Sequence, residues 1–244
     1  MMLLADIGNN REKWAIGDNG ELAMLGNFTT GDTATLSALL ARCPRDRIHR
    51  VVVASVAGTG RMDDVTRTIS AAGLPEVEVI NTPEAGGGIR VAYAEPQRLG
   101  CDRFLAMVAA HARYRGPLVV VDCGTAVTLD AVDAEGVHLG GAILPGRALM
   151  QSALMTGTVG VQVEAADSSE VFGKDTAAGV ASGAHYGLAG AIDGIVERMA
   201  AAFPAAPTLV ITGGDGPTLE PLLKHRYHGH PELVLEGLAI YADT

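Results

Sequence analysis

Two short segments, each with an aspartate, one further residue and a glycine after an apolar run, limit the possible folds of this chain most strongly. Asp-Ile-Gly-Asn at 6–9 follows the run 1–5, and Asp-Cys-Gly-Thr at 122–125 follows the run 118–121. In each segment the carboxylate stands where a buried strand would reach solvent. The glycine permits a tight turn whose backbone N–H groups approach a phosphate, and the acid can hold a cation. Two such turns predict a nucleotide site.

The two segments lie about half a chain apart, which predicts an internal duplication. A single Asp-x-Gly is also ordinary turn chemistry, but a second copy at an equivalent place favours duplication. The patterns predict an α/β fold with two half-domains, residues 1–115 and 116–244. The expected strands are 2–7, 12–17, 22–28, 49–56 and 77–80, then 117–122, 126–133, 137–144 and 207–212; the expected helices are 32–41, 59–72, one ending at 115, 146–155, 175–202 and 217–224.

The bulk composition is that of a folded globular protein with an acidic surface. Of the 244 residues 48% are apolar, and the formal net charge is −10. This charge disfavours binding to nucleic acid or to an anionic membrane surface, since both need a basic patch. Cys43, Cys101 and Cys123 form no Cys-x-x-Cys pair, so neither a disulfide framework nor a zinc site is indicated. Without a signal-peptide pattern or a run of membrane-spanning length, the chain is expected in a reducing cytoplasm.

The segment 93–103, between the two halves, carries an acid beside an arginine. Asp102 follows Gly100 and precedes Arg103 at the start of an apolar helix. An aspartate at that place commonly caps free N–H groups or complements the helix dipole. Alternatively, the acid accepts a proton from a hydroxyl while the arginine attracts an anionic substrate. The residues alone leave both roles open.

Three later segments place glycines at strand ends or helix starts. The segment 140–146 leads from a strand into a helix whose N-terminus can face an anion, although packing alone could demand its glycines. Thr176, after Gly-Lys-Asp at 173–175, is either a helix cap or a ligand. The glycine-rich turn 211–216 suits the wall of a nucleoside site.

Other phosphate and metal motifs are absent from the sequence. It contains no Walker motif and no strand-linked G-x-G-x-x-G. His225, His228 and His230 lie in a polar, glycine-containing segment without a cysteine, so a solvated loop is favoured over a zinc site.

The order of these motifs resembles that of the type III pantothenate kinases, a family of the actin-like ATPase superfamily. The similarity spans nearly the whole chain, and the Gly-x-Asp-Arg element at 100–103 is its most specific part. The matching motifs are Asp6-Ile7-Gly8-Asn9 with Lys13-Trp14, Tyr93-x-x-Pro96-x-x-Leu99-Gly100-x-Asp102-Arg103, Asp122-x-Gly124-Thr125, Gly140-Gly141 with Pro145-Gly146, Gly173 to Thr176, Thr212-Gly213-Gly214 and Leu235-Glu236-Gly237-Leu238.

The resemblance implies a duplicated ribonuclease-H-like fold, in which each half-domain has a mixed five-stranded sheet with helices and ATP binds between the halves. It implies ATP-dependent phosphorylation of pantothenate to 4′-phosphopantothenate, the first step of coenzyme A biosynthesis. The implied cofactors are Mg²⁺ with ATP and a monovalent cation, potassium or ammonium. A homodimer is also implied, with the pantothenate site near its interface.

The same resemblance implies roles for single residues. Asp102 would be the catalytic proton acceptor, and Asp122 would bind the monovalent cation. Asn10 departs from the family pattern, where Thr or Ser is common, but an amide can still donate to phosphate. The implied ATP-binding residues are Asp6, Ile7, Gly8, Asn9, Asn10, Arg11, Glu12, Lys13 and Thr125; the implied pantothenate-binding residues are Tyr93, Gly100, Cys101, Asp102, Arg103 and Thr176.

Two other functions compete with this one. A kinase of the same superfamily that acts on another small molecule, such as a sugar, is disfavoured by the segment 93–103. A noncatalytic accessory or regulatory protein of the same family is disfavoured because every proposed catalytic position is filled and the acidic charge opposes contact with DNA. A filament-forming or chaperone-like ATPase would need added subdomains, for which the chain looks too short.

Overall fold

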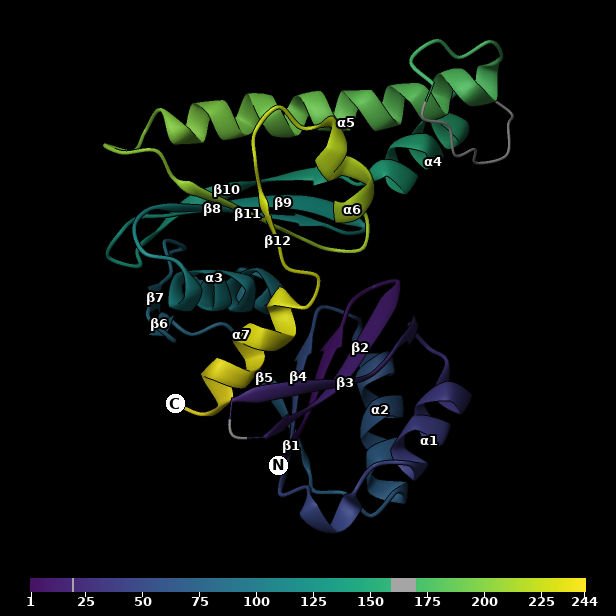
Figure 1. Cartoon of the computed structure of the whole chain (residues 1–244). Helices are drawn as coiled ribbons and strands as arrows, with labels where there is room; N and C mark the ends of the chain where they lie inside the picture. The colour runs from purple at the N-terminus through teal and green to yellow at the C-terminus, as the bar shows by residue number, and fades with distance from the viewer. Residues whose placement is uncertain (19, 159–169) are drawn as a thin grey trace. The chain divides into compact units, whose positions relative to one another are not determined.

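A computed structural model of the chain describes residues 1–18, 20–158 and 170–244, which form two compact units (Figure 1). The first unit comprises Met1–Arg113 and Glu232–Thr244, and the second comprises Tyr114–Pro231. Each unit contains a mixed five-stranded sheet. In the described part of the chain, no helix is both long and apolar enough to cross a membrane.

The sheet of the first unit has the order β3-β2-β1-β4-β5. The first three strands of the chain form an antiparallel meander, and β4 and β5 add in parallel on the other side of β1. Parallel addition needs a crossover, which α1 and α2 provide in turn. The bounds are β1 Met2–Ile7, β2 Arg11–Asp18, β3 Glu21–Thr29, α1 Thr33–Ala41, β4 Arg50–Ser55, α2 Thr59–Ala71 and β5 Val77–Ile80.

Alternation of apolar side chains along the strands builds the core of the first unit. Leu3, Ala5 and Ile7 of β1 point to one face, where they pack with the buried residues of α1 and α2. Figure 1 shows these two helices side by side on that face. Asp32 caps the N-terminus of helix α1, and its carboxylate accepts a hydrogen bond of 2.9 Å from Thr35 N.

Helices α3 (Cys101–Arg113) and α7 (Leu233–Ala242) pack closely against one another in the first unit. Their contact needs a glycine, because a Cβ at Gly237 would collide with the carbonyl group of Leu105. Phe104 and Tyr241 meet edge to face, with ring centroids 5.4 Å apart. The short elements β6 (Ala85–Gly86), β7 (Ile89–Arg90) and the 3-10 helix Pro96–Arg98 precede α3.

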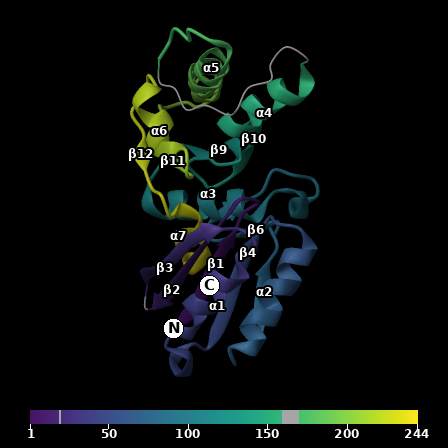
Figure 2. The same cartoon turned by 90° about the vertical axis from the view of Figure 1, so that its right-hand side faces the viewer.

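The sheet of the second unit has the order β10-β9-β8-β11-β12, which repeats the pattern of the first. Strands β10, β9 and β8 are antiparallel, and β11 and β12 add in parallel. The long helix α5 covers one face, as the turned view of Figure 2 also shows, and buries Leu188, Ile192 and Val196 against it. The bounds are β8 Leu118–Cys123, β9 Ala126–Val132, β10 His138–Pro145, α4 Arg147–Gly157, α5 Thr176–Ala200, β11 Thr208–Thr212, α6 Gly216–Leu219 and β12 His228–Gly229.

The compact units differ from the contiguous halves expected from the sequence. The chain leaves the first unit after Arg113, two residues before the expected boundary at 115, but it returns at Glu232. Residues 232–244, expected in the second half, pack with the first unit because α7 buries its apolar residues beside α3. This last helix was not among the expected elements.

Two smaller expectations were wrong. The helix expected at 217–224 is a four-residue helix, α6, followed by the 3-10 turn Glu220–Leu222, because Pro221 lacks the N–H that would continue it. The histidine segment is only partly a loop. His228 and Gly229 form β12 beside β11, and Tyr114 Oη lies 2.7 Å from His230 Nε2.

Candidate active site

The first Asp-x-Gly segment forms the tight turn between β1 and β2. Gly8 N donates to Arg11 O at 2.9 Å, and a Cβ on Gly8 would lie 3.2 Å from that oxygen. The turn 29–31 holds the loop through two hydrogen bonds. Thr30 Oγ1 donates to Gly8 O at 2.8 Å, and Thr30 N donates to Asn10 O at 3.0 Å. Asn9, Asn10 and Arg11 are exposed. The loop is therefore fixed at its base and open at its tip.

The side chains of the loop 6–13 do not all face outward. Ile7 lies in the apolar core and Glu12 is fully buried. The Arg11 guanidinium donates to the Asn27 side chain at 2.7 Å. Lys13 Nζ lies 3.2 Å from a Glu232 carboxylate oxygen, so the C-terminal helix carries a counter-charge for this lysine. Ile7 can therefore contact a ligand only through its backbone.

The segment 93–103 brings three predicted substrate residues together within the first unit. Asp102 lies in the first turn of α3, and its Oδ1 accepts from Arg103 N at 2.8 Å. A Cβ at Gly100 would collide with the same carboxylate oxygen. Arg103 is only 6% exposed, and its Nη1 donates to Tyr93 Oη at 3.2 Å with the ring centroid 5.9 Å from the guanidinium carbon. The arginine is thus oriented by an aromatic neighbour beside the acid.

Cys101 connects the start of α3 to the end of β4. Its Sγ donates to Ser55 O at 3.5 Å, and the side chain is buried. Burial raises the pKa of the Cys101 thiol to about 12, and the negative charges of Asp102 and Asp6 add to the shift. Both acids therefore act on one buried group. Any contact of Cys101 with a substrate would come from its backbone.

The second Asp-x-Gly segment lies at the equivalent place in the second unit. Asp6 and Asp122 are each the fifth residue of the central strand of their sheets, β1 and β8. Gly124 N donates to Ala126 O at 3.1 Å, which closes the turn between β8 and β9 as Gly8 closes the first. The duplication expected from the sequence therefore extends to the position of the acid in the strand.

Two glycine-containing segments bond directly to this second turn. Gly146 N, at the start of α4, donates to Thr125 O at 3.0 Å, and Asp215 N donates to Cys123 O at 2.9 Å. Gly213 has a φ of +89°, and a Cβ there would overlap both Asp122 Oδ1 and Cys123 O. The Gly213 backbone therefore lies against the Asp122 carboxylate and the Cys123 carbonyl, and oxygen atoms of these two kinds bind hard cations in proteins.

Thr176 is the first residue of α5 and is exposed. The helix cap is Asp175, whose carboxylate accepts from Ala178 N at 2.8 Å. Of the two roles that the sequence left open for Thr176, capping is therefore performed by its neighbour.

Sequence reasoning missed two charged pairs beside these loops. Glu12 is bonded to Arg61, and Arg147 Nη2 lies 3.7 Å from Asp215 Oδ1. Glu12 lies between the charged residues Arg11 and Lys13, so the sequence carries no signal of its burial. Arg147 directly follows the Pro-Gly of 145–146, but nothing in the sequence connects it to Asp215.

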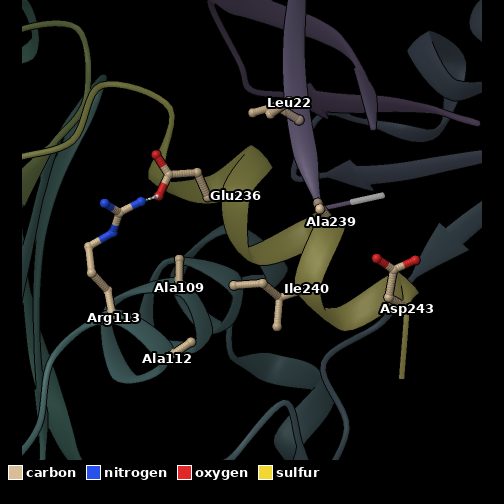
Figure 3. A pocket seen from close by; sticks show the side chains of 9 residues that line it. Leu22, Ala109, Ala112, Arg113, Glu236, Ala239, Ile240 and Asp243 are labelled. Carbon is tan, nitrogen blue, oxygen red and sulfur yellow. Dashed lines mark hydrogen bonds and ion pairs between the residues drawn. The ribbon is translucent and has the colours of Figure 1, made fainter. Parts of the chain in front are cut away.

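A hollow of about 320 Å³ lies elsewhere in the first unit, between α3, α7 and the start of β3. Figure 3 shows Leu22, Ala109 and Ile240 around it, with the ion pair Arg113–Glu236 of 2.8 Å at one side. None of its lining residues belongs to the loops described above. In the described residues no group of three or more His, Cys, Asp or Glu side chains could hold a metal ion. The predicted site residues therefore lie in the first turn and the segment 93–103 of the first unit and, considered separately, in the second turn and the start of α5 in the second unit.

Two sheets with the same strand order, each with an acid near the end of its central strand, define the protein as a member of the α/β class with the actin-like ATPase fold. Among solved structures, the chain resembles the activator of the 2-hydroxyisocaproyl-CoA dehydratase from Clostridium difficile with bound ADPNP. The TM-score is 0.55 at 16% identity, over 99% of this chain and 93% of that chain. This likeness confirms the fold class that the sequence predicted.

Comparison of sequences identifies the family within this class. A family model for type III pantothenate kinase matches residues 2–198. The type III pantothenate kinase of Nitrosococcus oceani is 40% identical over 100% of this chain and 95% of the relative. That of Herminiimonas arsenicoxydans is 38% identical over 98% and 96%. The chain therefore belongs to the type III pantothenate kinase family and is an ATP-dependent kinase that phosphorylates an alcohol group.

Proposed function

We propose that this enzyme phosphorylates the primary hydroxyl of pantothenate to give 4′-phosphopantothenate, with Asp102 as the proton acceptor. The observation that carries the proposal is the cluster of Asp102, Arg103 and Tyr93 at the start of α3, joined by hydrogen bonds of 2.8 and 3.2 Å. The carboxylate can accept the proton of the attacking hydroxyl. The neighbouring guanidinium can bind the negative charge of the substrate.

The chemical step transfers one phosphoryl group. The hydroxyl oxygen of pantothenate bonds to the γ-phosphorus of ATP while the bond from that phosphorus to the β,γ-bridging oxygen breaks. The proton of the hydroxyl passes to the Asp102 carboxylate, and ADP leaves with the bridging oxygen. In a loose transition state the hydroxyl becomes acidic late, so an acceptor that also orients the oxygen is sufficient.

The neighbours of Asp102 bind the substrate in this account. Arg103 pairs with the pantothenate carboxylate, and its bond to Tyr93 keeps the guanidinium from rotating away. Thr176 donates or accepts through its hydroxyl, and support comes from Asp175, which already serves as the helix cap. Gly100 and Cys101 contribute backbone groups, since Gly100 has no side chain and the Cys101 thiol bonds to Ser55.

The two Asp-x-Gly turns bind ATP in this account. The loop from Asp6 to Lys13 presents N–H groups and the exposed Asn9, Asn10 and Arg11 to the phosphates, and Thr125 contacts ATP from the second turn. Mg²⁺ bound with the phosphates would neutralise charge that develops during transfer. Asp122 would hold the monovalent cation, potassium or ammonium. Support comes from the Asp122 carboxylate and the Cys123 carbonyl, which lie against the Gly213 backbone.

The proposed homodimer is supported by exposed apolar residues of the second unit. Phe172 is 82% exposed and Val171 60%, and Leu149 and Leu154 of α4 are exposed at 44% each. Val171 O accepts from Ser182 of α5 at 2.9 Å, which keeps this segment along the helix that begins at Thr176. We propose that a second copy of the chain covers these exposed apolar side chains.

We also propose that the enzyme works in the cytoplasm, because its proposed substrate ATP is supplied there.

The substitution Asp102→Asn tests the assigned role. An amide cannot accept the proton, so kcat should fall by about 100-fold or more. The KM for ATP should change little, and circular dichroism should show a folded protein. Asp64→Asn is the control, because Asp64 pairs only with neighbouring Arg67 on the exposed side of α2. Wild-type turnover in Asp102→Asn would remove Asp102 from the mechanism.

A further inference from the structure

A buried ion pair lies directly behind the first phosphate loop. Glu12, at the second position of β2, has a fully buried side chain, and the Arg61 side chain from α2 is only 8% exposed. Arg61 Nε donates to Glu12 Oε1 at 2.6 Å. The two residues are 49 positions apart, so the pair ties β2 to α2.

The Glu12 carboxylate accepts two further hydrogen bonds. Gly31 N donates to Oε1 at 3.2 Å, and Trp14 Nε1 donates to Oε2 at 3.2 Å. Arg61 also reaches Thr33 Oγ1, with its Nη1 3.4 Å away. Both oxygens of the buried carboxylate are therefore satisfied, as a charge removed from water requires.

These contacts extend to the phosphate loop through the turn 29–31. Thr30 of that turn holds the loop on one side through Gly8 O and Asn10 O. Gly31, the next residue, is held on the other side by Glu12. The ion pair thus fixes the support on which the loop 8–11 rests.

We propose that Glu12 and Arg61 are positioning residues that hold this loop in its ATP-binding geometry and that neither touches the nucleotide. The pair is a costly way to fill a core, because two apolar residues of similar volume would stabilise the fold at least as well. Its benefit is a directional arrangement of hydrogen bonds that apolar packing does not supply. The inference rests on the proposed role of the loop in ATP binding, and it assigns Glu12 a different part from that of a ligand.

The substitution Glu12→Gln tests the proposal with little change of shape. One oxygen becomes an NH₂ group, so the side chain loses an acceptor and the charge that pairs with Arg61. The Kd for Mg·ATP, measured by calorimetry without pantothenate, should rise by about tenfold, the loss of one charge-assisted hydrogen bond. The KM for pantothenate should stay within about twofold, because the segment 93–103 is untouched.

A second variant and a control complete the experiment. Arg61→Lys keeps the charge but cannot bond Glu12 and Thr33 together, so the Kd for Mg·ATP should rise again. Glu78→Gln breaks another ion pair of the same unit, with Arg50 at 2.9 Å, and should change neither constant. Trp14 is the only tryptophan, so its emission reports directly whether the network around Glu12 has changed.

The outcomes separate this inference from the proposed function. An unchanged Kd for Mg·ATP in a folded Glu12→Gln protein with shifted Trp14 emission would overturn the positioning role. Failure of both variants to fold would overturn it too, since the pair would then determine folding rather than ATP affinity. If the wild-type protein binds Mg·ATP but does not phosphorylate pantothenate, the proposed function fails while the Kd comparison still decides the role of the pair.

Discussion

At the scale of single residues, Cys101 is informative because its thiol lies near Asp102 and Asp6. Burial and these charges raise its pKa to about 12, and burial also raises the pKa of Cys43 and of Cys123. All three cysteines are unpaired and buried. The unfolded chain ionises its thiols from about pH 8.5, before the folded chain does, so these groups lower the stability of the fold as the pH rises further.

We therefore predict that the folded enzyme resists thiol reagents. At about pH 8 the thiolate is the reactive species, and the folded state suppresses it at each cysteine. A dithiobenzoate reagent should react slowly or not at all with native protein and should titrate three thiols in urea. Rapid reaction of one native thiol, assigned by mass spectrometry to Cys101, would show that the segment around Asp102 opens to solvent.

The role of a residue could be predicted from the sequence where its partner is a neighbour in the chain, and not where the partner comes from a distant element. Asp102 and Arg103 are adjacent, so their pairing of acid and cation could be predicted from the chain alone. Glu12 was predicted only as part of the ATP loop, because its partner Arg61 comes from another element. Asp175 could not be preferred over Thr176 as the cap, since both residue types cap helices.

At the scale of elements, the contact between α3 and α7 offers a sharp test of packing. A methyl group at Gly237 would collide with the Leu105 carbonyl, which is main chain and cannot rotate away. Gly237→Ala should lower the free energy of unfolding by at least about 2 kcal/mol in urea titrations, as overpacking does.

The matched control is Gly190→Ala on α5, where an added Cβ meets no atom within 4 Å. This exposed helical glycine should give a stability gain of up to about 1 kcal/mol, because alanine loses less backbone entropy. Equal effects of the two substitutions would contradict the close approach of α7 to α3.

The strands were easier to predict than the last helix for a physical reason. Strands β1, β2, β8 and β9 have apolar runs that end at turn residues, which is a local pattern. Helix α7 buries every residue from 233 to 238 except Glu236, so it lacks the polar face on which a helical period depends. Strand β12 has only two residues and owes its existence to pairing with β11, which no local pattern predicts.

At the scale of the whole molecule, duplication explains why fold and family could be predicted together. The same strand order occurs twice, with Asp6 and Asp122 at equivalent positions. The division into units was less accessible, because residues 232–244 return to the first unit through packing with α3. The chain order alone places them in the second half. Lys13, paired with Glu232, shows that this returning segment also reaches the first phosphate loop.

Transfer of the γ-phosphoryl group of ATP to pantothenate can be measured by product analysis with mass spectrometry. The purified protein is incubated with Mg·ATP in potassium buffer, with pantothenate or with glucose. We predict equal amounts of ADP and phosphopantothenate in the first reaction and no sugar phosphate in the second. Phosphorylated glucose, or ADP formed without phosphopantothenate, would contradict this prediction.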